Sequence, residues 1–61
     1  MTLKELLEKT SRFQKVAVFY GCQSRCETAM YLLENIGVSW LNSPVLEIRA
    51  DDYELSIVVG D

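Results

Sequence analysis

Cys22 and Cys26 are the side chains of this 61-residue chain whose type and spacing could most readily do chemistry. If a strand ends and a helix begins here, the helix N-terminus and the neighbouring Arg25 would lower the pKa of the thiols and favour redox activity. As metal ligands they supply two of the four that a structural zinc site requires, so such a site would be shared between two copies. Ordinary, partly buried thiols are the third interpretation. We favour this last one and therefore expect no metal and no cofactor.

Most other catalytic groups are missing from the sequence. The chain has no histidine, which removes the commonest general base and the usual partner of a nucleophilic serine or cysteine. Asp51 and Asp52 are adjacent carboxylates, but aspartate is also a common turn residue. The three glycines stand alone and form no phosphate-binding loop. We therefore predict that the protein is not an enzyme and that it acts by binding.

The charged residues are distributed unevenly along the chain. Residues 1–25 carry five basic and two acidic side chains, whereas residues 26–61 carry one basic and seven acidic side chains. The net charge of −3 argues against general nucleic-acid binding, yet the basic part could present a cationic surface to a phosphorylated ligand. Two solvated surfaces that aid solubility are the alternative explanation. With aromatic side chains that could stack on the partner, the predicted binding residues are Arg12, Lys15, Arg25, Tyr31 and Trp40.

A helix is expected at the start of the chain. Thr2 and Glu5 have the spacing of a capping box, in which each side chain bonds the backbone of the other residue. Leucines then recur at helical spacing and predict one buried stripe, with Phe13 also placed in the core.

Residues 15–20 are almost continuously apolar, which predicts a central strand covered on both faces, with Phe19 in the core. Gly21 marks the end of this strand, and residues 22–27 form either a short second strand or the start of the second helix. Apolar residues from Cys26 to Ile36 follow at intervals of three or four, which predicts that helix. It is capped either by Thr28 or by Ser24 with Glu27.

The C-terminal segment predicts an antiparallel β-hairpin. With Asp51 and Asp52 as a two-residue loop, Ala50 would face Tyr53, and Ile48 would face Leu55 on the apolar side. On the other side Arg49 would lie opposite Glu54 and form an ion pair.

Together these elements predict one α+β domain over residues 1–61, with an N-terminal helix, a central strand alone or in a hairpin, a second helix and the C-terminal hairpin. So small a domain buries only about 60% of its unfolded surface, and 49% of its residues are hydrophobic. We therefore expect a homo-oligomer, a dimer or higher. Few cysteines, no long apolar segment and a charged start lead us to expect a cytoplasmic protein with no membrane contact.

Part of the chain resembles the opening half of a glutaredoxin. The resemblance covers residues 16–40 and rests on VAVFYGCQSRC at 16–26 and LLENIGV at 32–38. It implies a minimal thiol oxidoreductase that uses Cys22 and Cys26. The cysteines have three residues between them in place of the family's two, with no proline, and the family's later Val-Pro pair and Gly-Gly turn are missing.

The whole chain is also similar to very small phage and prophage proteins of low-GC Gram-positive bacteria. The shared features are MTLKELLEK at 1–9, KVAV at 15–18, YLLE at 31–34 and VLEIRADDYELSIVV at 45–59. This resemblance implies a viral, anti-defence protein in the host cytoplasm that inhibits a host or defence factor. It would do so by protein contact or by nucleotide sequestration, that is, by holding a small phosphorylated ligand. A structural or assembly component is a further alternative.

Overall fold

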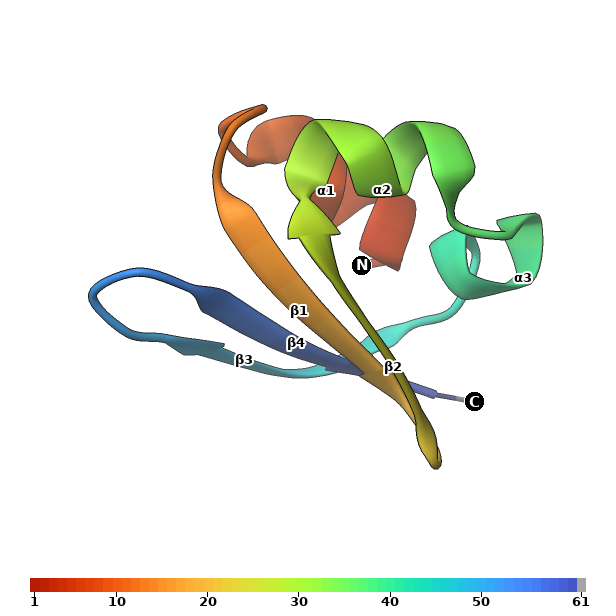
Figure 1. Cartoon of the computed structure of the whole chain (residues 1–61). Helices are drawn as coiled ribbons and strands as arrows, with labels where there is room; N and C mark the ends of the chain where they lie inside the picture. Colours follow the sequence, from red (N-terminus) through yellow and green to blue (C-terminus); the bar gives the residue numbers. More distant parts are fainter. Residues whose placement is uncertain (61) are drawn as a thin grey trace.

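A four-stranded sheet carries a layer of helices on one face in the computed structural model, which describes residues 1–60 (Figure 1). In chain order the elements are α1 (Leu3–Lys9), β1 (Lys15–Tyr20), β2 (Gln23–Thr28), α2 (Ala29–Asn35), α3 (Val38–Leu41), β3 (Val45–Ala50) and β4 (Leu55–Val59). The strand order is β2-β1-β4-β3; β1 and β4 are parallel, and the two outer pairs are antiparallel. The α+β class, the N-terminal helix and the C-terminal hairpin are confirmed.

The capping box at the start of α1 is formed as expected. The Thr2 backbone N–H donates to Glu5 Oε1 at 2.9 Å, and the Glu5 N–H donates to Thr2 Oγ1 at 3.3 Å. These bonds satisfy N–H groups that have no partner within the helix, and Leu3 and Leu7 then face the core.

Residues 22–27 belong largely to a strand, because β2 pairs with β1 along its whole length after a tight turn at Gly21. Gly21 has a φ of 59°, the left-handed conformation that glycine adopts without steric cost. The second helix therefore begins at Ala29, the start that a Thr28 cap predicts, and the alternative of a helix that includes residues 22–27 is wrong. Thr28 alone caps it, with its Oγ1 accepting from the Tyr31 N–H at 3.3 Å.

The predicted register of the C-terminal hairpin is wrong by two residues. Ala50 pairs with Leu55, and Ile48 with Ile57, so the loop contains four residues and not two. The cause is the Asp51 side chain, whose Oδ1 accepts from the backbone N–H groups of Tyr53 and Glu54 at 3.0 and 2.8 Å. This local turn is more favourable than a two-residue loop at the same place.

A shift by two residues keeps the predicted faces but changes the partners. Arg49 lies opposite Ser56, and its ion pair is with Glu47 of its own strand, at 2.8 Å, and not with Glu54. Tyr53 is in the loop with 86% of its surface exposed, so it makes no cross-strand contact of the predicted kind.

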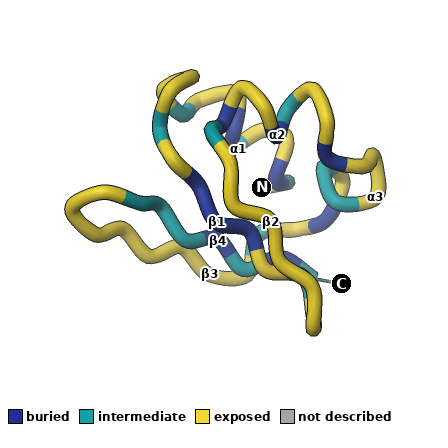
Figure 2. Tube along the Cα trace, in the orientation of Figure 1, coloured by how far each residue is buried: buried dark blue, intermediate teal, exposed yellow. Residues whose placement is uncertain are grey.

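The core lies between the helices and the sheet face that they cover (Figure 2). Its largest fully buried side chains are Leu3, Leu7, Val16, Val18, Leu32, Ile57 and Val59. The placement of Phe13 and Phe19 in this core is wrong. Phe13 is 76% exposed in the connection after α1, and Phe19 is 40% exposed because it points to the opposite face of the sheet.

No helix covers that opposite face, which we call the open face (Figure 1). Strand alternation and the pairing of the strands assign to it Ser24 and Cys26 of β2, Lys15, Ala17 and Phe19 of β1, Ser56 and Val58 of β4, and Glu47 and Arg49 of β3. The helices therefore cover β1 on one face and not on both, although Ala17, on the open face, is only 5% exposed. Within residues 1–60, no helix is long and apolar enough to span a membrane.

Candidate binding groove

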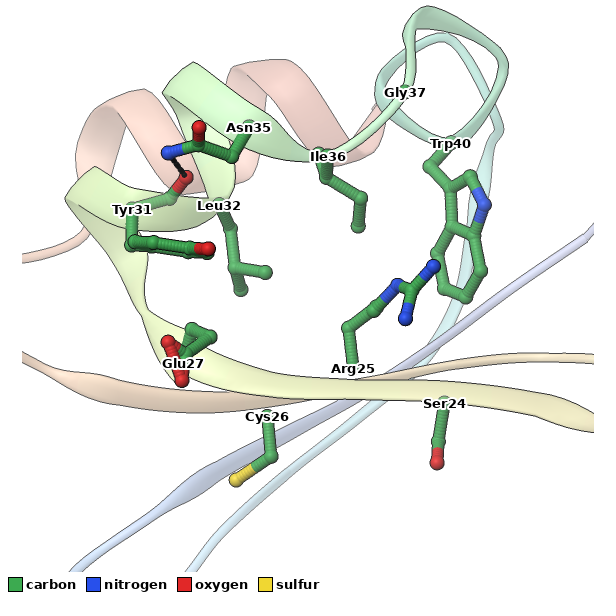
Figure 3. A pocket seen from close by; sticks show the side chains of 10 residues that line it. All are labelled: Ser24, Arg25, Cys26, Glu27, Tyr31, Leu32, Asn35, Ile36, Gly37 and Trp40. Carbon is green, nitrogen blue, oxygen red and sulfur yellow. Dashed lines mark hydrogen bonds between the residues drawn. The ribbon is translucent and has the colours of Figure 1, made fainter.

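A groove of about 540 Å³ lies between β2 and the helices α2 and α3, on the helix-covered side of the sheet (Figure 3). Its size is within the range of small-molecule sites. The side chains that give it chemical character are Arg25, Glu27, Tyr31, Asn35 and Trp40.

Strand β2 supplies the charged floor of the groove. Because successive side chains of a strand point to opposite faces, Arg25 and Glu27 point toward the helices, whereas Ser24 and Cys26 point away (Figure 3). Both charged residues are exposed, and neither forms an ion pair with any residue between 1 and 60.

Helix α2 supplies one wall. Tyr31 and Asn35 are four residues apart and therefore lie one turn apart on the same side of the helix. Asn35 Nδ2 donates to the Tyr31 backbone oxygen at 3.0 Å, which fixes the amide at the rim. The Tyr31 ring is half exposed and lies above Glu27 (Figure 3).

Trp40 of the short helix α3 forms the other wall. Its ring is 5.3 Å from the Tyr20 ring between centroids, with an angle of 57° between the planes, a geometry favoured by aromatic pairs. The Arg25 guanidinium carbon lies 6.0 Å from the Trp40 ring centroid, which is the outer limit of a cation–π interaction. The tryptophan is therefore supported by Tyr20 and packs against the core, while part of its surface lines the groove.

The two ends of the groove carry opposite charges. Arg25 lies at the end formed by Trp40, and Glu27 lies at the end formed by Tyr31 (Figure 3). Alternate residues of a strand are about 6.6 Å apart, which is a suitable spacing for two ends of one small molecule. The arrangement can bind an anionic group at one end and a hydrogen-bond donor at the other, with an aromatic ring beside each.

Three of the five predicted binding residues meet in this groove: Arg25, Tyr31 and Trp40. The other two do not. Arg12 lies at a separate hollow formed by α1, the connection that follows it and α2, and Lys15 is on the open face. The grouping failed for these two because positive charge in the sequence does not indicate where in the fold a residue lies: Arg12 is in the connection between α1 and β1, and Lys15 points to the face of the sheet opposite the groove.

Sequence reasoning missed Glu27 and Asn35. The signal for Glu27 was its spacing of two from Arg25, which places both on one face once residues 22–27 are read as a strand. Asn35 had a corresponding signal in its spacing of four from Tyr31.

The two cysteines do not have the geometry that redox activity was expected to use. Cys22 is in the turn before β2 and Cys26 is inside that strand, so neither begins a helix. They are four positions apart along an extended chain, a distance of roughly 13 Å between their Cα atoms, which is beyond the reach of a disulfide. The pKa of Cys26 is raised, first by desolvation and then by the Glu54 carboxylate, which accepts a hydrogen bond from Sγ at 3.6 Å. A raised pKa reduces the thiolate that redox chemistry needs.

Across residues 1–60 no group of three or more potential ligands is placed to hold a metal ion. No protein-family model, curated protein sequence or solved structure matches the chain.

Proposed function

We propose that this protein is a non-catalytic binding protein whose groove holds a nucleotide that carries an amino group on its base. The observation that carries the proposal is the convergence of Arg25 and Trp40 at one end of the groove, with the guanidinium beside the ring and free of any carboxylate of residues 1–60. A free guanidinium next to an aromatic surface suits a ligand in which a phosphate is attached to a planar base.

Each wall of the groove supports a different part of such a ligand. Arg25 would bind the phosphate with two parallel hydrogen bonds, the geometry that guanidinium groups favour. The base would lie against Trp40 or Tyr31, since stacking on an aromatic side chain contributes about 1–3 kcal/mol. Glu27 would accept from the amino group of the base, as carboxylates do when they recognise cytosine.

The chemistry of the groove favours binding over turnover. The sequence has no histidine to act as a general base. The exposed Glu27 carboxylate is not paired with a second acid of the groove. A protein that binds a nucleotide without transforming it lowers the free concentration of that nucleotide. This is the inhibitory role that the resemblance to small phage proteins implies, and it belongs in the cytoplasm, where nucleotides are abundant and both thiols stay reduced.

The proposal is tested by isothermal titration of the wild-type protein with AMP, GMP, CMP and UMP, with inorganic phosphate as the minimal anion. Arg25→Glu should weaken nucleotide binding by about tenfold or more, because a hydrogen bond to a charged group contributes about 1.5–3 kcal/mol. Glu27→Gln should weaken the binding of AMP, GMP and CMP, whose bases carry an amino group, and leave the binding of UMP nearly unchanged.

Arg12→Glu is the matched control, because it makes the same charge change at an exposed residue outside the groove. Equal losses for Arg12→Glu and Arg25→Glu would show a general charge effect and refute the site. Formation of a product from any of the nucleotides would refute the non-catalytic assignment.

A further inference from the structure

The open face combines exposed apolar side chains with charged neighbours. Phe19 is 40% exposed, and Val58, its partner on the adjacent strand, is partly exposed. The apolar run of β1 is typical of a strand covered on both faces.

We propose that the open face binds the open face of a second copy of this chain, with a two-fold axis parallel to the strands and passing between β1 and β4. The result would be a sandwich of two sheets about 10 Å apart, with the helices on the outside.

Charge complementarity within the face carries the proposal. In the parallel register of β1 and β4, two pairs of neighbours lie on the open face: Ala17 beside Ser56, and Phe19 beside Val58. Continuing the register by one residue toward the start of both strands places Lys15 beside Glu54. The proposed axis exchanges the positions of β1 and β4 between the copies. Lys15 of each copy then faces Glu54 of the other, and Phe19 faces Val58 of the other. The ion pairs form twice, once on each side of the axis, as a two-fold interface requires.

The alternative two-fold axis, perpendicular to the strands, gives a worse match. It would place Lys15 over Phe19 and Glu54 over Val58, so that charged groups would lose water to apolar partners. It would also bring Arg49 close to Arg49 of the other copy. The charges therefore select the parallel axis and set the direction in which the two sheets run.

The area of the face suits a reversible dimer. Four strands spaced about 4.8 Å apart, with five residues of about 3.3 Å each, cover roughly 19 by 17 Å. With side-chain relief, each copy would bury on the order of 500 Å², or about 1,000 Å² in total, which is at the lower limit for specific interfaces. The groove lies on the other side of the sheet, so dimerisation would leave both grooves open and does not depend on what they bind.

The test uses two charge reversals of full-length protein, Lys15→Glu and Glu54→Lys, studied by sedimentation velocity. Each variant alone should be monomeric at concentrations where the wild type is dimeric, because like charges would meet twice across the axis. An equimolar mixture of the two should form a heterodimer, because the substituted side chains of the two variants would then meet as one ion pair. The unchanged Lys15 and Glu54 would meet as the other. Within each variant chain, positions 15 and 54 carry the same charge, so no ion pair between them can form inside one copy. If association returns when the variants are mixed, the ion pairs must therefore form between copies.

Lys4→Glu on α1 is the matched control and should leave the dimer unchanged, since Lys4 is exposed on the helix layer. Phe19→Asp should prevent association both alone and in any mixture, and circular dichroism should show that all variants remain folded. A monomeric wild type at several hundred micromolar would overturn the proposal. So would a mixture of the two reversals that stays monomeric, or single reversals that still dimerise.

Discussion

At the scale of single residues, the environment of a side chain decides more than its type. Arg25 and Arg12 are both exposed arginines, but only Arg25 lies beside an aromatic ring in a groove. The same holds for the two cysteines, since Cys26 has a carboxylate within hydrogen-bond distance and Cys22, within residues 1–60, does not.

This difference predicts unequal thiol reactivity. Because its pKa is raised by desolvation and by Glu54, Cys26 has less thiolate near neutral pH and should react with iodoacetamide more slowly than Cys22. Glu54→Gln should increase the rate at which Cys26 reacts with iodoacetamide and leave the rate of Cys22 unchanged. The rates can be measured by mass spectrometry of digested samples, at low micromolar concentration so that association does not protect Cys26. A faster reaction at Cys26 than at Cys22 in the wild type would contradict the predicted role of Glu54.

Two carboxylates predict a loss of stability in acid. The pKa of Glu5 is lowered mainly by the backbone hydrogen bond with Thr2, and the pKa of Asp51 is lowered by the N–H groups of Tyr53 and Glu54. Carboxyl groups with a lowered folded-state pKa stabilise the fold above their unfolded pKa values, 4.5 and 3.8. That contribution is lost as the pH falls through the lowered pKa values of the folded state. Urea unfolding should therefore show a smaller loss of stability between pH 6 and pH 2 for a Glu5→Gln/Asp51→Asn variant. An identical loss in the variant and the wild type would argue against this assignment.

At the scale of elements, local hydrogen bonds set the boundaries. Thr28 ends β2 and caps α2, and this junction turns the chain from the sheet into the helix that carries Tyr31. Thr28→Ala should lower the free energy of unfolding by about 1 kcal/mol, the usual cost of a lost N-cap. Ser24→Ala, on the open face of the same strand, should have almost no effect. Equal effects in urea titrations would show that the cap contributes nothing specific.

The elements also show what could be predicted from the sequence. The capping box fixed the start of α1 because its two side chains bond within one turn. The start of α2 stayed open between two alternatives because β2 has polar residues on both faces and lacks the alternation that identifies a strand, while Cys26 happens to continue the helical spacing. The hairpin faces were predicted correctly, but the loop length was not, since a shift of two residues leaves the face pattern unchanged.

The candidate site could be predicted only in part. Arg25, Tyr31 and Trp40 were identified by residue type, and their convergence depends on β2 being a strand that faces α2 and α3. Arg12 and Lys15 had the same charge as Arg25 but lie elsewhere, because Arg12 is in the connection between α1 and β1 and Lys15 points to the open face. The position of β2 at the edge of the sheet is a long-range property that no local pattern encodes.

At the scale of the whole molecule, one sheet separates two surfaces of different character. The helix side contains the core and the groove, and the open face has apolar residues between opposite charges. A chain of this length gains little from its own core, so covering the open face would add stability as well as set the assembly. In the proposed dimer, two grooves would face outward on opposite sides.

The most direct measurement for the binding function uses Trp40, the one tryptophan of the chain, as a reporter in the groove. Its fluorescence should change saturably on titration with AMP, GMP or CMP, at one site per chain, and the nucleotide should be recovered unaltered. Arg25→Glu should shift the midpoint to at least tenfold higher concentration. Binding that leaves the Trp40 emission unchanged, or recovery of a converted nucleotide, would contradict the account.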